Sequence, residues 1–178
     1  YSGLGQHGPA VQDHDEAIRL DPQLALAYSN RGATYSDLGQ YDMALQDHDQ
    51  AIRLDPELVQ AYSNRGNTYG KLGQIERAIE DYSEAIRLDP RAVMPNLELA
   101  ELYFRQDRMR LGWDYYQQYL QRSGRQSARS LWLGIRLASD LGYADQQSSY
   151  ELALENIYRR SAEYREWQNW KASQESGK

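Results

Sequence analysis

A histidine flanked by two aspartates occurs twice and is the local pattern that most suggests chemistry. The copies are Asp13, His14 and Asp15, and Asp47, His48 and Asp49. An imidazole with two carboxylates could bind a metal ion or act as an acid–base pair. On a helix, however, adjacent residues point to different faces, so the carboxylates cannot converge with the imidazole. We therefore predict neither a metal site nor catalysis at these motifs.

The remaining sequence contains no pattern typical of an enzyme. The 178 residues include no cysteine, which excludes a disulfide scaffold, a thiolate zinc site and a cysteine nucleophile within them. Neither a glycine-rich phosphate loop nor a nucleophile elbow nor metal-ligand spacing occurs. We predict a non-catalytic protein with no catalytic residues, no metal and no cofactor.

Composition predicts a folded protein with an uneven charge. Hydrophobic residues make up 40% of the sequence, and its 15 Tyr, 4 Trp and 1 Phe argue against disorder. A net charge of −6 disfavours nucleic acid as a partner, and no apolar run approaches the roughly 18 residues of a membrane span. Residues 1–90 carry 15 acidic and 7 basic groups, whereas residues 91–178 carry 11 and 13. The two halves therefore differ in charge, −8 against +2.

An internal repeat organises the elements that must position these side chains. The string AYSNRG begins at Ala27 and again at Ala61, and AIRLDP begins at Ala17, Ala51 and Ala85, always 34 residues apart. Residues 22–55 and 56–89 are identical at 20 of 34 positions. This period and pattern resemble the tetratricopeptide repeat, a helix-turn-helix unit. The resemblance implies an all-α superhelical solenoid of antiparallel helix pairs with a C-terminal capping helix.

Residue spacing independently supports paired helices. Apolar or small residues recur every three or four positions in residues 58–71 and again in 75–88, as two helical faces require. Gly73 lies where the turn is needed, and Pro90 follows the second helix.

The repeat register divides the chain into three parts. Residues 1–21 form a partial repeat with a truncated start, and residues 22–123 form three repeats. Residues 124–178 are expected to form a divergent helical pair, about 126–140 and 144–158 joined around Gly142, and a capping helix from about 161 to 171. Aromatic residues on that last helix form either a docking strip or, as we favour, packing against the preceding pair.

The same register places the histidines in the core. His14 and His48 occupy the position held by Tyr82 and Tyr116 in later repeats, and His7 matches Tyr41. We therefore interpret them as replacements of core-facing aromatic residues.

The tetratricopeptide resemblance implies that the first helix of each pair faces a concave groove that binds a protein or peptide. The predicted groove residues are Asn30, Asp37, Asn64, Asn67, Lys71, Leu97, Glu101, Phe104 and Arg105. The amides could hold an extended peptide backbone, since each offers a donor and an acceptor. The alternative is that these are ordinary solvent-exposed positions. A further partner surface is predicted at Trp113, Tyr115 and Tyr119, where one helix is aromatic on more than one face.

Repeat proteins that capture chaperone tails clamp a carboxylate with basic groove residues. The corresponding positions here are Ser29, Ala33, Asn64, Met94 and Glu98. Only Asn64 fits such a clamp, so a chaperone tail is disfavoured. The apolar side chains of Leu97, Phe104, Leu131 and Ile135 instead indicate a ligand with hydrophobic anchors.

A second resemblance covers about the last 85 residues. Residues 97–109 read LELAELYFRQDRM and 113–120 read WDYYQQYL; QSARSLWLGIRLA begins at Gln126 and SSYELALENIYRRSAEYREWQ at Ser148. These strings resemble the type IV pilus biogenesis and stability proteins, tetratricopeptide lipoproteins called pilotins. The family sits on the periplasmic side of the outer membrane and helps the secretin pore assemble. Arg159 departs from the proline usual in that family.

This resemblance implies a pilotin-like scaffold that binds the secretin subunit at the periplasmic face of the outer membrane, anchored by a lipid upstream of Tyr1. The alternative is a cytoplasmic tetratricopeptide adaptor that binds unrelated peptides. A third is an enzyme whose catalytic domain lies upstream. The oligomeric state is open at this point.

Overall fold

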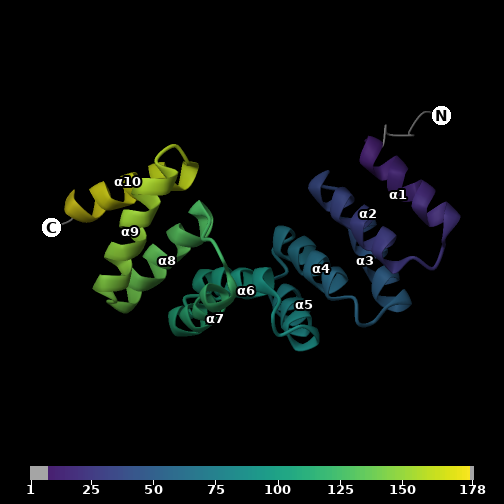
Figure 1. The fold of residues 1–178 in the computed structure, drawn as a ribbon, viewed down its shortest axis with the longest axis horizontal. Coiled ribbons are helices and arrows are strands. Elements are labelled where there is room, and N and C mark those ends of the chain that lie inside the picture. The colour runs from purple at the N-terminus through teal and green to yellow at the C-terminus, as the bar shows by residue number, and fades with distance from the viewer. Residues whose placement is uncertain (1–7, 177–178) are drawn as a thin grey trace. The chain divides into compact units, whose positions relative to one another are not determined.

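The computed structural model describes residues 8–176, which form ten helices and no strand (Figure 1). The helices are α1 (Pro9–Leu20), α2 (Ala25–Asp37), α3 (Tyr41–Leu54), α4 (Val59–Lys71), α5 (Ile75–Leu88), α6 (Val93–Arg105), α7 (Met109–Arg122), α8 (Ala128–Leu141), α9 (Ala144–Tyr158) and α10 (Ala162–Ser176). This all-helical architecture confirms the predicted fold class. The predicted match of His7 to Tyr41 and the start of the partial repeat lie outside the described residues.

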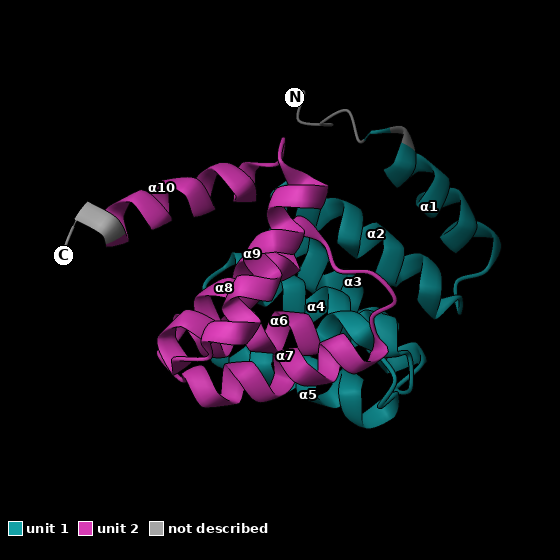
Figure 2. Ribbon diagram, turned by 60° about the vertical axis from the view of Figure 1, so that its left-hand side comes forward, with its two compact units in different colours: residues 1–95 teal, residues 96–178 magenta. Residues whose placement is uncertain are grey.

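The chain divides into two compact units, one ending at Pro95 and the other beginning at Asn96 (Figure 2). Unit 1 contains α1 to α5, and unit 2 contains most of α6 together with α7 to α10. None of the helices in the described ranges is long and apolar enough to cross a membrane.

In unit 1, α2 packs against α3 and α4 against α5, as the repeat predicts. Gly39 and Gly73 turn the chain within each pair with φ of 74° and 72°, a left-handed conformation that glycine adopts without strain. Fully buried alanines such as Ala44 and Ala78 allow the paired helices to approach closely. The predicted helix-turn-helix geometry therefore follows from where the small residues lie.

The Asp-Pro step at the end of each AIRLDP string has a specific structural role. Asp21, Asp55 and Asp89 follow the last residues of α1, α3 and α5. Each aspartate accepts a hydrogen bond from the backbone N–H two residues later, at 2.9 to 3.0 Å. The side chain thereby closes a turn beyond the helix, where proline prevents the helix from continuing.

Unit 2 keeps the helix-turn-helix plan with different residues at the turns. Asp107 takes the position of the turn glycine and adopts φ of 57°, which aspartate tolerates better than most side chains. Ser127 caps α8 by accepting from the backbone N–H of Ser130, and Gly142 ends that helix with φ of 75°. Gly142 thus lies between α8 and α9, at the position predicted for the join.

The C-terminal helix packs on the preceding pair. Tyr164 and Trp167 of α10 are buried in one cluster with Leu131, Ile135 and Leu154 of α8 and α9. This contact confirms packing, rather than an exposed docking strip, as the role of the aromatic residues in this cluster.

Candidate functional site

The Asp-His-Asp motif of α3 is a junction of ion pairs between helices. Arg31 on α2 donates two hydrogen bonds of 2.7 Å to Asp47 of its own repeat and one of 2.7 Å to Asp15 on α1. Arg65 on α4 repeats this arrangement 34 residues later. The two aspartates of the motif therefore bind two different arginines, and neither binds the histidine between them.

Burial and hydrogen bonding shift the pKa values of the side chains in these ion pairs. The hydrogen bond to Asp81 raises the pKa of Arg65, and the one to Asp47 raises the pKa of Arg31. Burial raises the pKa of Asp81, although Arg65 opposes that shift. The sequence prediction missed these arginines. The sequence does contain a signal for these pairs: each arginine has one aspartate 16 residues before it and another 16 residues after it.

His48 is fully buried, which confirms its predicted place in the core. Its ring lies against Gly32, where a Cβ atom would stand only 2.7 Å from the ring. Burial disfavours the charged imidazolium and lowers the pKa of His48 to about 4. His14 is half-buried on α1. Across residues 8–176, no group of three or more His, Asp or Glu side chains is placed to hold a metal ion.

The predicted groove of unit 1 contains a polar hollow of about 330 Å³. The side chains that line it are Ala33, Ser36, Asp37, Asn64, Asn67 and Lys71. Four of the five residues predicted for this half of the groove thus lie together. Asn30 is not among the lining residues; its side-chain oxygen accepts from Gln60 at 3.1 Å.

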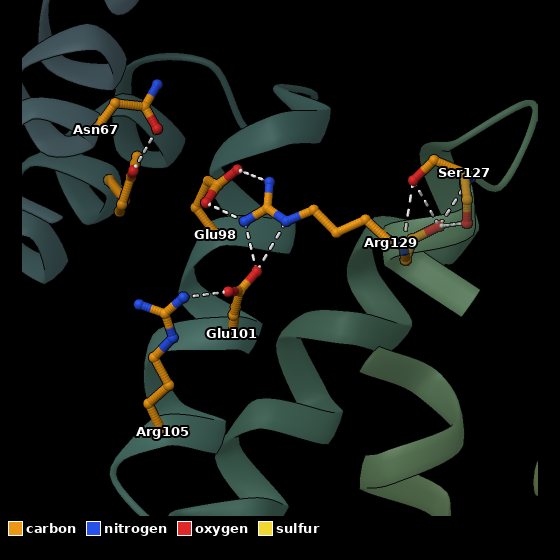
Figure 3. Close-up of polar contacts among 8 residues, drawn as sticks. Asn67, Glu98, Glu101, Arg105, Ser127 and Arg129 are labelled. Carbon is orange, nitrogen blue, oxygen red and sulfur yellow. Dashed lines mark hydrogen bonds and ion pairs between the residues drawn. The ribbon is translucent and has the colours of Figure 1, made fainter. Parts of the chain in front are cut away.

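The polar groups of this hollow already have hydrogen-bond partners, some within the hollow and some outside its lining. Lys71 Nζ lies 2.8 Å from Asp37 Oδ1, and Asn64 donates to Ser29 at 3.1 Å. Asn67 accepts from the Tyr82 hydroxyl at 2.7 Å; Figure 3 shows this bond. These bonds fix the side chains across neighbouring helices, so an incoming peptide would have to share or replace them.

Unit 2 contains a larger pocket of about 580 Å³. It is lined by Glu101, Phe104, Arg105, Asp107, Met109, Arg129, Trp132, Leu133, Arg136, Asp140, Glu163 and Glu166. Glu101, Phe104 and Arg105 were predicted for the groove. The contributions of α8 and α10 were not. Leu131 and Ile135, the α8 residues expected to contact a ligand, are fully buried in the core and do not line the pocket.

A charged network borders this pocket. Arg129 binds Glu98 and Glu101 with side-chain distances of 2.5 to 2.9 Å, and Arg105 binds Glu101 at 2.6 Å (Figure 3). The hydrogen bond to Glu98 is the main cause that raises the pKa of Arg129. Arg136 lies 4.1 Å above the centre of the Phe104 ring, a cation–π contact. The pocket therefore combines an aromatic floor with charged walls.

Two predicted residues are buried and do not line the pocket, unlike Phe104, which is 8% exposed but contributes to the lining. Leu97 is 2% exposed and is absent from the pocket lining. Tyr119 is 4% exposed and stacks on Tyr116 with ring centres 6.0 Å apart. Both side chains pack in the interior, so we no longer include either in a binding surface.

The other two aromatic residues of α7 remain candidates for partner contact. Trp113 is half-buried beside Tyr143, at a ring distance of 5.1 Å. Tyr115 is half-buried and stacks on Tyr103 at 5.4 Å. Each ring is held in place by a neighbour while part of it faces solvent.

The paired helices and their 34-residue repeat define a tetratricopeptide-repeat protein, a scaffold for protein interaction. The Tetratricopeptide repeat family profile matches residues 25–58 and 59–91. The type IV pilus assembly protein PilF of Pseudomonas aeruginosa is 42% identical over 72 residues, which are 40% of this chain and only 28% of that protein's length. A solved structure of Pseudomonas aeruginosa PilF is 30% identical, covers 89% of this chain and 72% of its own, and has a TM-score of 0.80. The chain therefore belongs to the PilF family of tetratricopeptide-repeat proteins.

A solved structure of PilW, described as a widely conserved type IV pilus biogenesis factor, shares the fold. It is 21% identical, covers 88% of both chains and has a TM-score of 0.59. At this identity the likeness concerns the fold alone.

Proposed function

We propose that this protein is a non-catalytic scaffold that assists secretin assembly in type IV pilus biogenesis, as pilotin lipoproteins do. The observation that supports this most is the similarity to PilF, which covers 89% of the chain with a TM-score of 0.80. That coverage is too large to be confined to the regular repeats at residues 25–91. It therefore includes much of the divergent unit 2, where the larger pocket lies.

The proposed mechanism is capture of a segment of the secretin subunit. The pocket of unit 2 offers the partly exposed side chains of Met109 and Trp132 as apolar contacts for hydrophobic anchors of that segment. Phe104 and Leu133, which are 8% and 5% exposed, contribute only the small part of their surface that lines the pocket. The partly exposed rings of Trp113 and Tyr115 extend the apolar surface of the same unit. A bound subunit would be kept from premature association until it reaches its assembly partners.

The same proposal includes a location at the periplasmic face of the outer membrane, with a lipid anchor as in pilotins. Recovery of the upstream coding sequence tests the location. A signal peptide that ends in a lipidation cysteine supports the proposal, whereas a cytosolic start supports a cytoplasmic adaptor instead.

Substitution of Phe104 or Tyr115 by Ala tests the binding surface. We expect each variant to bind the purified secretin about 5- to 30-fold more weakly, since a buried aromatic contact typically contributes 1 to 2 kcal/mol or more. Binding is measured by titration calorimetry, and far-UV circular dichroism verifies that helical content is retained.

Leu152→Ala is the matched control. Leu152 is an exposed apolar residue of α9 outside the pocket, so its truncation should leave secretin binding unchanged. Unchanged binding in both Phe104→Ala and Tyr115→Ala would contradict the proposed surface.

A further inference from the structure

Most of the cations at the unit 2 pocket are already neutralised. Arg129 directs its donors at Glu98 and Glu101, and Arg105 shares Glu101 (Figure 3). These two arginines and two glutamates balance each other in charge. They form a charge-balanced border of the pocket, so the other charged residues determine which ligand charge is favoured.

The remaining charged groups are mostly acidic. Within the described ranges, the carboxylates of Asp140 and Glu163 have no hydrogen-bond or ion-pair partner. Glu166 accepts one hydrogen bond, from Trp132 Nε1 at 3.0 Å. Arg136 is the opposing cation, and its guanidinium lies over Phe104 rather than on a carboxylate. The pocket is therefore acidic, although residues 91–178 as a whole carry a net charge of +2.

The floor of the pocket is apolar and its size suits a short stretch of peptide. Phe104, Met109, Trp132 and Leu133 lie between the charged walls. The volume of about 580 Å³ falls within the roughly 300 to 1,000 Å³ typical of ligand clefts. Side chains of α6, α8 and α10 converge here, and the three carboxylates of Asp140, Glu163 and Glu166 come from α8 and α10.

We infer that this pocket binds a lysine or arginine side chain of a partner's extended segment, next to an apolar residue of that segment. The basic group would lie among Asp140, Glu163 and Glu166, while the apolar neighbour packs on Trp132 and Met109. Arg136 keeps its donors free for carbonyl oxygens of the bound backbone. This inference deepens the proposed scaffold function and rests on it only for which protein supplies the segment.

Capped tripeptides test the inference without any secretin. The probes are acetylated, amidated Leu-Arg-Leu, its counterpart with citrulline, which has the shape of arginine but no charge, and Leu-Glu-Leu. The indole N–H of Trp132 is the reporter in ¹H–¹⁵N NMR titrations, assigned among the four tryptophans with a Trp132→Phe variant. We expect a saturable shift with the arginine peptide, and binding at least about fivefold tighter than that of the citrulline peptide.

The double variant Asp140→Asn/Glu163→Gln should abolish this preference for arginine. The matched control Asp114→Asn/Asp145→Asn removes the same charge from exposed positions outside the pocket and should keep the preference. Equal binding of the arginine and citrulline peptides, tighter binding of Leu-Glu-Leu, or no saturable shift at millimolar peptide would overturn the inference.

The outcome is separable from that of the proposed function. Arginine-selective binding combined with no affinity for the secretin would refute the pilus role and leave the pocket's specificity intact. Secretin binding without arginine selectivity would refute the pocket's specificity alone.

Discussion

Replacement of Arg65 by Leu should be among the most destabilising changes in unit 1. The arginine side chain is 21% exposed and makes a bidentate contact with Asp81, which is 6% exposed, and a further bond to Asp49. Removal of one partner of a buried pair leaves an uncompensated charge and costs about 3 to 5 kcal/mol. Because Arg65 retains some solvent contact, we expect the lower end, about 3 kcal/mol.

Urea unfolding followed by far-UV circular dichroism measures this loss. Arg87→Leu is the control, because Arg87 is 67% exposed and pairs with Glu84 only across one helical turn. Such a surface pair contributes about 0.5 kcal/mol or less. The double variant Arg65→Leu/Asp81→Leu should recover much of the lost stability, since no buried charge is left unpaired.

The loss of folding stability in Arg65→Leu should also depend on pH. Without Arg65, burial raises the pKa of Asp81 further above its value in the unfolded chain, so the folded state binds the proton more readily. Stability of Arg65→Leu relative to the wild type should therefore increase as pH falls toward 4. A loss no larger than that of Arg87→Leu, or a double variant as unstable as the single one, would refute this reasoning.

Two further predictions concern packing in unit 1, and both are measured as shifts in urea unfolding. His48 has a pKa of about 4 when folded, so the unfolded chain alone binds a proton between about pH 6.5 and 4. Stability should therefore fall by up to about 3 kcal/mol as pH decreases through that window, and His48→Phe should remove this contribution; an unchanged pH slope would contradict it. Gly66→Ala should destabilise by about 1 to 2 kcal/mol, because its Cβ would lie 3.0 Å from the Tyr82 ring. Gly70→Ala should stabilise the protein by about 0.5 to 1 kcal/mol, because a Cβ atom at Gly70 would have no neighbour within 4 Å. If both substitutions changed stability in the same direction, the contact with the Tyr82 ring would not be what distinguishes the two sites.

The regular helices were predictable because the 34-residue repeat aligns each position with its equivalents in the other repeats. The pattern predicted a helix over 75–88, and α5 is Ile75–Leu88. It also placed His48 in the core, since the equivalent residue is an aromatic one. Both results follow from the same physical constraint: helices that stack at a fixed period need large and small residues at fixed positions.

The functional surface was less predictable, because it depends on side chains that have no equivalent in the regular repeats. Arg129 binds Glu98 across 31 residues, and the carboxylate of Glu163 reaches the pocket from α10, where no repeat pattern remains. Tyr119 was assigned to a surface although it follows Tyr116 by one helical turn, which places both rings on the buried side. That misassignment could have been avoided from the spacing alone.

Whether this protein assists secretin assembly is best measured in cells of the source organism. The measurement is the fraction of secretin recovered as multimers, compared between cells that lack the protein and cells that produce the wild type or the Phe104→Ala/Tyr115→Ala variant at equal levels. We predict multimers with the wild type, and mainly monomeric secretin both without the protein and with the variant. Full multimer formation in cells that lack the protein would contradict the account.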